Sequence, residues 1–110
     1  MEERVYIGLL LDYYGGLLTE NQRTTLELYY TEDLTLSEIG ESTGITRQGA
    51  RDAIKRGETA LRRAEEQAGM VKRYMAFRQA IEELETHLEQ VGDEKALSML
   101  QTALEIWENE

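Results

Sequence analysis

The sequence predicts an all-helical protein, and three observations lead to that class. The chain of 110 residues contains no proline, so no residue forces a helix to break. Hydrophobic residues make up 41% of it and charged residues 31%, which is enough apolar material for a core. Two threonines are each followed three residues later by Gln or Glu, a pattern typical of helix N-termini.

The first two helices are predicted from these end signals. One runs from about residue 3 to residue 14 and stops at a Gly-Gly pair, with Val5, Leu9, Leu10 and Tyr13 as its apolar face. Thr19 then forms a capping box with Gln22, in which each side chain binds the backbone N–H of the other. This box opens a second helix that continues to about residue 30.

The next two helices are predicted to form a helix-turn-helix motif. Thr35 and Glu38 form a second capping box, and the short helix that they open ends near residue 43. Gly44 suits the left-handed conformation that closes a helix, and Thr46 caps a longer helix over residues 47–63. Gly40 lies four residues before Gly44, where two crossing helices leave room only for a small residue. This layout is that of a helix-turn-helix.

Beyond residue 69 the apolar spacing becomes that of a coiled-coil seam. Intervals of four and three residues separate Met70, Tyr74, Phe77, Ile81, Leu84, Leu88 and Val91. Gly92 breaks this helix, and a final helix carries Leu97, Leu100, Leu104 and Trp107. Two amphipathic helices joined by so short a turn fold into an antiparallel hairpin. We therefore predict a helix-turn-helix module at residues 1–68, a kink or module boundary at Gly69, and a C-terminal helical hairpin at residues 69–110.

The charge distribution points to one candidate binding surface. The chain has a net charge of −10, yet residues 46–63 hold six basic and two acidic residues, so the rest of the chain sums to −14. Phosphate neutralisation dominates the affinity of proteins for nucleic acid, and arginine, lysine and glutamine at the start of a recognition helix read bases or hold phosphates. The candidate nucleic-acid-binding residues are Thr46, Arg47, Gln48, Arg51, Lys55 and Arg56.

Several short segments also resemble a known family. They are Leu18-Thr-Glu-Asn-Gln22, Leu28-Tyr-Tyr, Leu34-Thr-Leu-Ser-Glu-Ile39, Gly44-Ile-Thr-Arg-Gln48 and Ile54-Lys-Arg56. Together they resemble region 4, the promoter-reading C-terminal part of sigma factors, and more closely the YlxM family of small bacterial helix-turn-helix proteins. The resemblance implies an all-helical, often dimeric, cytoplasmic protein. It also implies a regulatory part in the signal recognition particle pathway, because the family's genes typically lie beside those of the particle's GTPases.

The sequence departs from this family's pattern at a few positions. Gly40, Gly49 and Gly57 stand where such motifs usually have alanine, at a cost of about 1 kcal/mol each in helix propensity. The recognition helix is therefore expected to be less stable than in relatives. Ala50 replaces a larger aliphatic residue, which thins the packing, and Asp52 dilutes the basic surface.

Other side chains that invite a chemical interpretation have simpler explanations. His87 is the single histidine and lies beside the predicted seam. The carboxylates at Glu82, Glu83, Glu85 and Glu89 have no histidine partner, and a solvated helix face explains them better than a metal site does. The tyrosine pairs at residues 13–14 and 29–30 are more often core residues than base-stacking ones. No nucleophile–base pair, phosphate-binding glycine loop or cysteine is present, so we expect neither enzymatic activity nor a cofactor.

Two functions remain open at this stage. One is a nucleic-acid-binding regulator whose ligand is DNA or a structured RNA. The other is a protein-interaction adaptor whose acidic and helical surfaces bind the GTPase of the signal recognition particle. We also expect a homodimer, because the long seam exceeds what the final helix can cover. The alternative is that the seam packs back on the N-terminal module. No apolar stretch approaches the roughly 20 residues that span a bilayer, so a cytoplasmic location without membrane insertion is expected.

Overall fold

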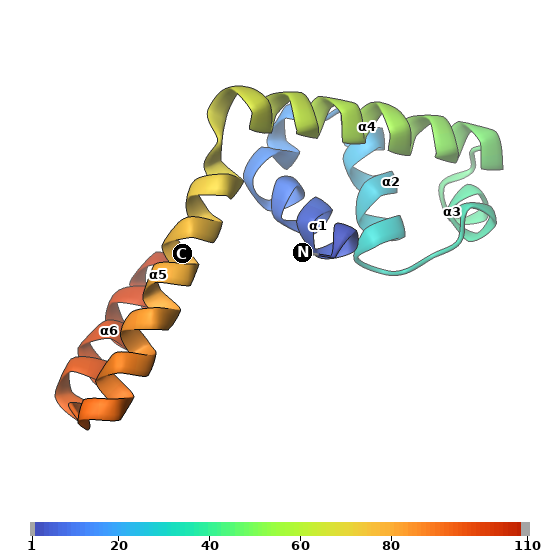
Figure 1. Ribbon diagram of the computed structural model, residues 1–110. Coiled ribbons are helices and arrows are strands. Elements are labelled where there is room, and N and C mark those ends of the chain that lie inside the picture. The colour runs from blue at the N-terminus through green and yellow to red at the C-terminus, as the bar shows by residue number, and fades with distance from the viewer. Residues whose placement is uncertain (1, 109–110) are drawn as a thin grey trace. The chain divides into compact units, whose positions relative to one another are not determined.

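The computed structural model describes residues 2–108, and every regular element in this range is a helix (Figure 1). The elements are α1 (Glu3–Tyr14), a short 3₁₀ turn η1 (Gly15–Leu17), α2 (Glu20–Tyr30), α3 (Leu36–Thr43), α4 (Arg47–Ala68), α5 (Met70–Val91) and α6 (Glu94–Glu108). The all-helical fold class predicted from the sequence is confirmed.

The helix starts follow the predicted caps. Thr19 accepts a hydrogen bond from the Gln22 amide, and the Gln22 side chain accepts one from the Thr19 amide, which completes the capping box. Thr35 and Glu38 form the second box in the same way. These hydrogen bonds satisfy amides that the first turn of a helix leaves without partners, so local sequence fixes where α2 and α3 begin.

The chain divides into two compact units, Met1–Lys72 and Arg73–Glu110. In the first unit, α4 lies across α1, α2 and α3 (Figure 1). Fully buried side chains from all four helices form its core: Ile7, Leu10, Leu26, Ile39, Ala50 and Leu61.

The buried face of α1 differs from the predicted one. Ile7, Leu10 and Tyr14 point into the core, whereas Val5 is 52% exposed and Tyr13 is 36% exposed. Apolar and aromatic residues occur on more than one side of α1, so its sequence has little amphipathic contrast. The docking of α1 against α4 decides which side is buried.

Gly69 separates α4 from α5 as a full break rather than a kink. Its φ of 64° is left-handed, a conformation that glycine adopts without strain, and Met70 begins a new helix. The Glu65 carboxylate accepts hydrogen bonds from the Val71 amide at 2.9 Å and the Lys72 amide at 3.0 Å. The Tyr14 hydroxyl accepts from the Met70 amide at 3.0 Å and donates to Glu65 at 2.6 Å. Residues of α1 and α4 therefore cap α5.

The same contacts shift the acidity of both side chains. Burial and the hydrogen bond to Glu65 raise the pKa of the Tyr14 hydroxyl above its ordinary value. For Glu65, partial burial raises the carboxyl pKa, but the hydrogen bonds from Tyr14, Val71 and Lys72 outweigh it and leave the pKa below its usual range.

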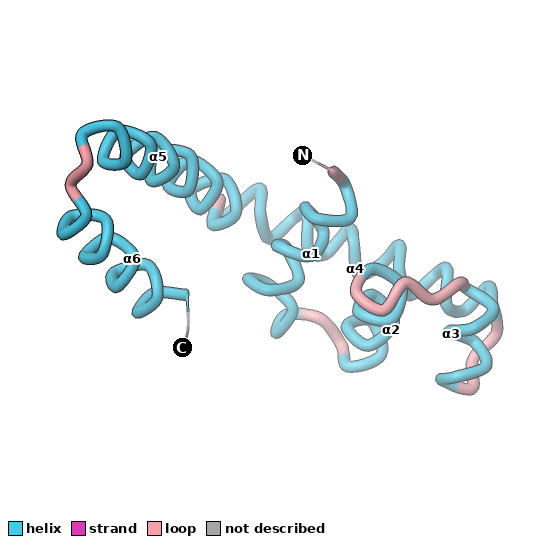
Figure 2. The backbone as a smooth tube through the Cα atoms, turned by 90° about the horizontal axis from the view of Figure 1, so that it is seen from below, coloured by secondary structure: helices cyan, strands magenta, loops and turns pink. Residues whose placement is uncertain are grey.

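The second unit is the predicted antiparallel hairpin, and the two views of its ribbon agree that α5 and α6 run side by side (Figures 1 and 2). Gly92 turns the chain with a φ of 74°, and Asp93 accepts from the Ala96 amide at 3.0 Å at the start of α6. The predicted seam splits into two groups of side chains. Those that are half-buried or buried are Tyr74, Ile81, Leu88, Leu97, Leu100 and Leu104, and those that are exposed are Met70, Phe77, Leu84, Val91 and Trp107.

Candidate nucleic-acid interface

Helices α3 and α4 form the predicted helix-turn-helix. Gly44 closes α3 with a φ of 76°, and the Gly40 carbonyl accepts from the amides of both Gly44 and Ile45, at 2.9 and 3.1 Å. A Cβ atom on Gly40 would lie 2.7 Å from the Ile45 carbonyl oxygen. The turn therefore passes so close to α3 that any side chain at this position would push the backbone of the turn away. The two helices are held at the crossing that the sequence predicts.

The second helix of the motif starts at Thr46, whose hydroxyl accepts from the Gly49 amide at 2.9 Å. Its buried face consists of Ala50, Ala53, Ile54, Gly57 and Leu61, so the opposite side turns toward solvent. All six candidate binding residues named above are exposed.

Three of the candidate cations lie in one row. Arg47, Arg51 and Lys55 are separated by four residues each, which places successive side chains about 40° apart around the helix. We refer to these three residues as the basic row. Arg56 lies about 100° round the helix from Lys55 and about 140° from Arg51, so it points to another side of α4. The sequence prediction grouped Arg56 with these three residues because it is basic, but its helical position places it on another side of α4.

The three residues of the basic row form no ion pair with another residue of the described range 2–108. Within residues 2–108, the ion pairs join Arg4 to Asp33, Arg62 to Glu3 and Arg78 to Glu108, and none of them involves a residue of the basic row. The Gln48 side-chain amide donates to Asp52 at 3.0 Å, which holds the nearest carboxylate of α4 beside Gln48. The basic row is thus available to an external anion.

Arg47 lies at the junction of two shallow, open depressions. One, of about 330 Å³, is lined by Leu36, Arg47, Gln48 and Arg51. The other, of about 320 Å³, extends over the start of α3 and is lined by Arg4, Tyr29, Asp33, Leu34, Thr35, Leu36, Ser37 and Arg47. Both depressions open to solvent on the surface that carries Arg47.

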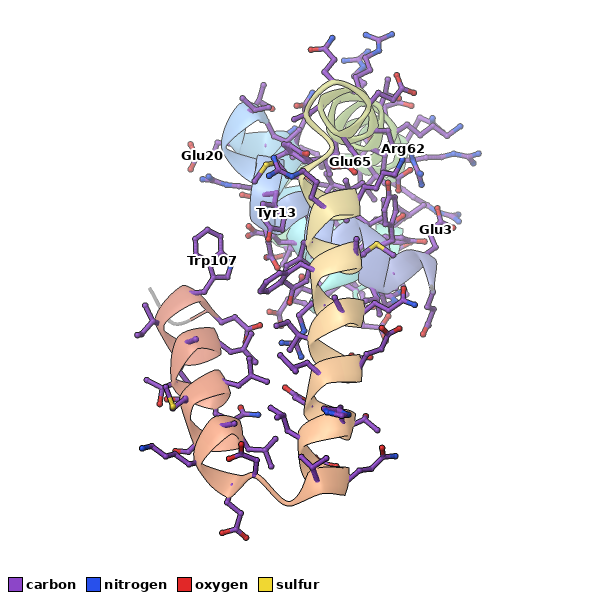
Figure 3. All side chains as sticks on the ribbon, turned by 60° about the vertical axis from the view of Figure 1, so that its left-hand side comes forward. Glu3, Tyr13, Glu20, Arg62, Glu65 and Trp107 are labelled. Carbon is purple, nitrogen blue, oxygen red and sulfur yellow. The ribbon has the colours of Figure 1, made fainter. Side chains whose placement is uncertain are left out.

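Two further arginines serve packing instead of binding. Arg62 of α4 and Glu3 of α1, both labelled in Figure 3, form an ion pair at 3.1 Å. The Arg62 guanidinium also lies 5.8 Å from the centre of the Tyr6 ring. Arg4 donates to the Tyr29 and Tyr30 carbonyls at 3.0 and 2.9 Å, which satisfies the free C-terminal end of α2. Neither contact carries a local sequence signal, because the partners are 25 or more residues apart.

Most of the paired tyrosines belong to the core of the first unit. Tyr14 is buried, and Tyr29 and Tyr30 pack against the buried cluster. The Tyr30 hydroxyl donates to the Glu58 carboxylate of α4. Burial and this hydrogen bond raise the pKa of Tyr30 above its ordinary value. Through their hydroxyls, Tyr14 ties α1 and Tyr30 ties α2 to α4, the second helix of the helix-turn-helix.

Other kinds of site are not assembled in the described part of the chain. Residues 2–108 contain no group of three or more His, Asp or Glu side chains placed to hold a metal ion. Within the same range no helix is both long and apolar enough to cross a membrane.

Comparison with known proteins agrees with this geometry. The model of the family UPF0122, described as "Putative helix-turn-helix protein, YlxM / p13 like", matches residues 1–101. A UPF0122 protein of Desulforamulus reducens is 50% identical over 74 residues, which cover 67% of this chain and 63% of that protein. A UPF0122 protein of Caldanaerobacter subterraneus is 42% identical over 83 residues, covering 76% of this chain and 71% of the relative. The helix-turn-helix, the all-helical fold and these matches together place the chain in the UPF0122 family of YlxM/p13-like proteins.

Proposed function

We propose that this protein is a non-enzymatic regulator that binds nucleic acid through α4 and acts in the signal recognition particle pathway. One observation carries the binding part of the proposal. A protein of net charge −10 keeps Arg47, Arg51 and Lys55 exposed, unpaired and in one row on the second helix of a helix-turn-helix. Phosphate groups would dock on such a row.

The size of the basic row limits how the protein binds. Three cations neutralise about three phosphates, so the slope of log affinity against log salt should be no steeper than about −3. Arg56, if a ligand reached it, would bring this limit to about −4. An electrostatic contribution this small, opposed by acidic surfaces elsewhere, does not hold a protein on arbitrary duplex DNA at physiological salt. We therefore propose a structured target, and the family resemblance directs the choice to the RNA of the signal recognition particle.

The decisive variant removes two members of the basic row, Arg47→Ala with Arg51→Ala. Its matched control is Arg56→Ala with Arg63→Ala, which deletes the same charge from exposed positions on another side of α4. Binding to particle RNA, to random duplex DNA and to the isolated particle GTPase is measured at several salt concentrations. We expect the first variant to weaken RNA binding by about tenfold or more and to flatten the salt slope by about 2, while the control changes both much less.

A second candidate function rests on the acidic surface. Outside residues 46–63 the chain carries a net charge of −14, which would attract a basic protein. In this alternative the helix-turn-helix is a scaffold, and the ligand is the particle's GTPase subunit. Tight binding to the GTPase that is unchanged in the Arg47/Arg51 variant, together with no measurable RNA binding by the parent protein, would refute the nucleic-acid proposal.

A further inference from the structure

A carboxylate lies among the exposed cations of α4, where it opposes the binding of phosphate. Asp52 is exposed, and it belongs to none of the ion pairs within residues 2–108. Its side chain accepts a hydrogen bond from the Gln48 amide nitrogen, one helical turn earlier, at 3.0 Å. A negative charge beside Arg51 and Lys55 repels phosphate and weakens the binding that these cations support. The carboxylate therefore needs an explanation other than phosphate binding.

Gln48 and Asp52 lie on the outermost line of α4. The inner side of this helix is defined by its buried residues, which are Ala50, Ala53, Ile54, Gly57 and Leu61. At about 100° per residue, Gln48 and Asp52 both point within about 30° of the direction opposite to the mean of these buried positions. Arg47 and Arg51 point about 115° and 75° away from that direction, toward one flank. When such a helix docks on nucleic acid, its outermost side chains meet the bases and its flanking side chains meet the phosphates.

The hydrogen bond between the two side chains determines what they offer to a base. An ionised carboxylate can only accept, so the nitrogen of the Gln48 amide, and not its oxygen, must face Asp52. The Gln48 carbonyl oxygen and the second Asp52 oxygen are then two acceptors on the outer line of the helix. Such acceptors attract an amine and repel a keto oxygen. Adenine at N6 and cytosine at N4 carry an amine where guanine and uracil carry a keto oxygen.

We infer that Gln48 and Asp52 form a base-reading pair that selects adenine or cytosine over guanine and uracil. The inference rests on the proposed nucleic-acid function and names the class of base that the α4 surface recognises. Glutamine pairs with adenine through N6 and N7, and a carboxylate accepts from the N4 amine of cytosine. For the adenine contact, Asp52 also positions the Gln48 amide. In a structured RNA the base that is read is an unpaired one, because the major groove of an A-form helix is too narrow for side chains to enter.

The test uses four stem-loop RNAs that share one stem and differ in a six-nucleotide loop made of a single base. The bases are adenine, hypoxanthine, cytosine and uracil. Hypoxanthine is the keto counterpart of adenine, and uracil is that of cytosine, so each pair of loops compares an amine with a keto oxygen. Binding of the full-length protein is followed by fluorescence anisotropy at low salt, where the basic row is least screened. We expect one amino loop to bind about tenfold more tightly than its keto counterpart, and the preferred loop distinguishes adenine from cytosine.

Asp52→Asn tests the base-reading pair itself. The variant removes the charge and keeps the size of the side chain, and its amide can donate to a keto oxygen. Binding of every loop should become tighter, because a negative charge is lost, yet the preference for the amino loop should fall below about threefold. Gln48→Ala, which frees the Asp52 carboxylate, should lower the preference as well. The matched control is Glu66→Gln, which removes the same charge from an exposed position about 20 Å farther along α4 and should leave the preference unchanged.

The outcomes distinguish failure of this inference from failure of the proposed function. Equal binding of all four loops, weakened by Arg47→Ala with Arg51→Ala, would overturn the base-reading pair and leave the basic row as a binding surface. A preference that persists unchanged in Asp52→Asn would assign base discrimination to other residues and would also overturn the inference. If the parent protein binds none of the loops, the inference is wrong, and if it does not bind the particle RNA either, the proposed function is wrong as well.

Discussion

Replacing Gly40 by alanine tests the helix-turn-helix crossing directly. The added Cβ would stand 2.7 Å from the Ile45 carbonyl oxygen and 3.5 Å from the Arg47 amide nitrogen. Both neighbours are backbone atoms, so neither can turn away by changing a rotamer. The turn would have to move by about 0.5 Å or more, away from the two amide hydrogen bonds that the Gly40 carbonyl accepts.

The magnitude follows from two opposing contributions. Overpacking of this kind costs about 1–3 kcal/mol, and alanine recovers about 0.5–1 kcal/mol through its better helix propensity. We expect Gly40→Ala to lower the free energy of unfolding by about 1–2 kcal/mol, and the melting temperature by roughly 5–12 °C. Gly8 is the matched control, since it also lies within a helix but has no heavy atom within 4 Å of its would-be Cβ. Gly8→Ala should stabilise the protein by up to about 1 kcal/mol.

Urea and thermal unfolding of the two variants and the parent, followed by far-UV circular dichroism, measure both effects. Opposite signs for the two glycines are the expected result. If Gly40→Ala proved as stable as the parent, the close approach of α3 to the turn would not restrict this position.

Three further outcomes are expected. Thr35→Ala removes the capping hydroxyl of α3 and should cost about 1 kcal/mol in urea unfolding, whereas Thr24→Ala, which removes an exposed hydroxyl within α2, should cost little. Glu65 has a lowered pKa in the folded state, so its contribution to stability is present above its unfolded pKa of about 4.3 and is lost as pH falls through the folded value. Unfolding of Glu65→Gln measured against pH should therefore lack part of the acid-side loss seen in the parent. Arg78→Ala breaks the surface pair with Glu108 and should change the unfolding free energy by no more than about 1 kcal/mol, and a larger loss would assign that pair a structural role.

The helix boundaries could be predicted from sequence because their signals are local. Thr19, Thr35 and Thr46 begin helices, and Gly44 and Gly69 end them, each through hydrogen bonds or backbone angles within a few residues. The buried face of α1 could not be predicted in the same way. Apolar and aromatic residues of α1 occur on more than one side of that helix, so the contacts with α4, far along the chain, decide which of them point inward.

In the candidate binding site, too, some features follow from local sequence and others depend on contacts between distant residues. Exposure of the predicted cations on α4 follows from helical periodicity, and the structure agrees with it. The separation of Arg56 from Arg51 also follows from periodicity, but sequence reasoning grouped the basic residues by type. The ion pair of Arg62 with Glu3 could be found only from the fold, since the two partners are 59 positions apart in the sequence. In the hairpin, the alternating spacing of four and three correctly marked the apolar residues, but a single neighbouring helix covers only half of them.

The capping of α5 by Tyr14 and Glu65 has a consequence for the order in which the molecule folds. The Met70 amide finds its partner only after α1 has docked on α4, because Tyr14 lies 56 residues before it, whereas the Val71 and Lys72 amides bond to Glu65 only six and seven residues away. The cap of α5 is therefore complete only once the N-terminal unit has formed. The Met70 amide hydrogen should exchange with solvent more slowly while that unit stays closed, so its exchange rate reports the integrity of a core to which α5 contributes a single fully buried side chain, Val71.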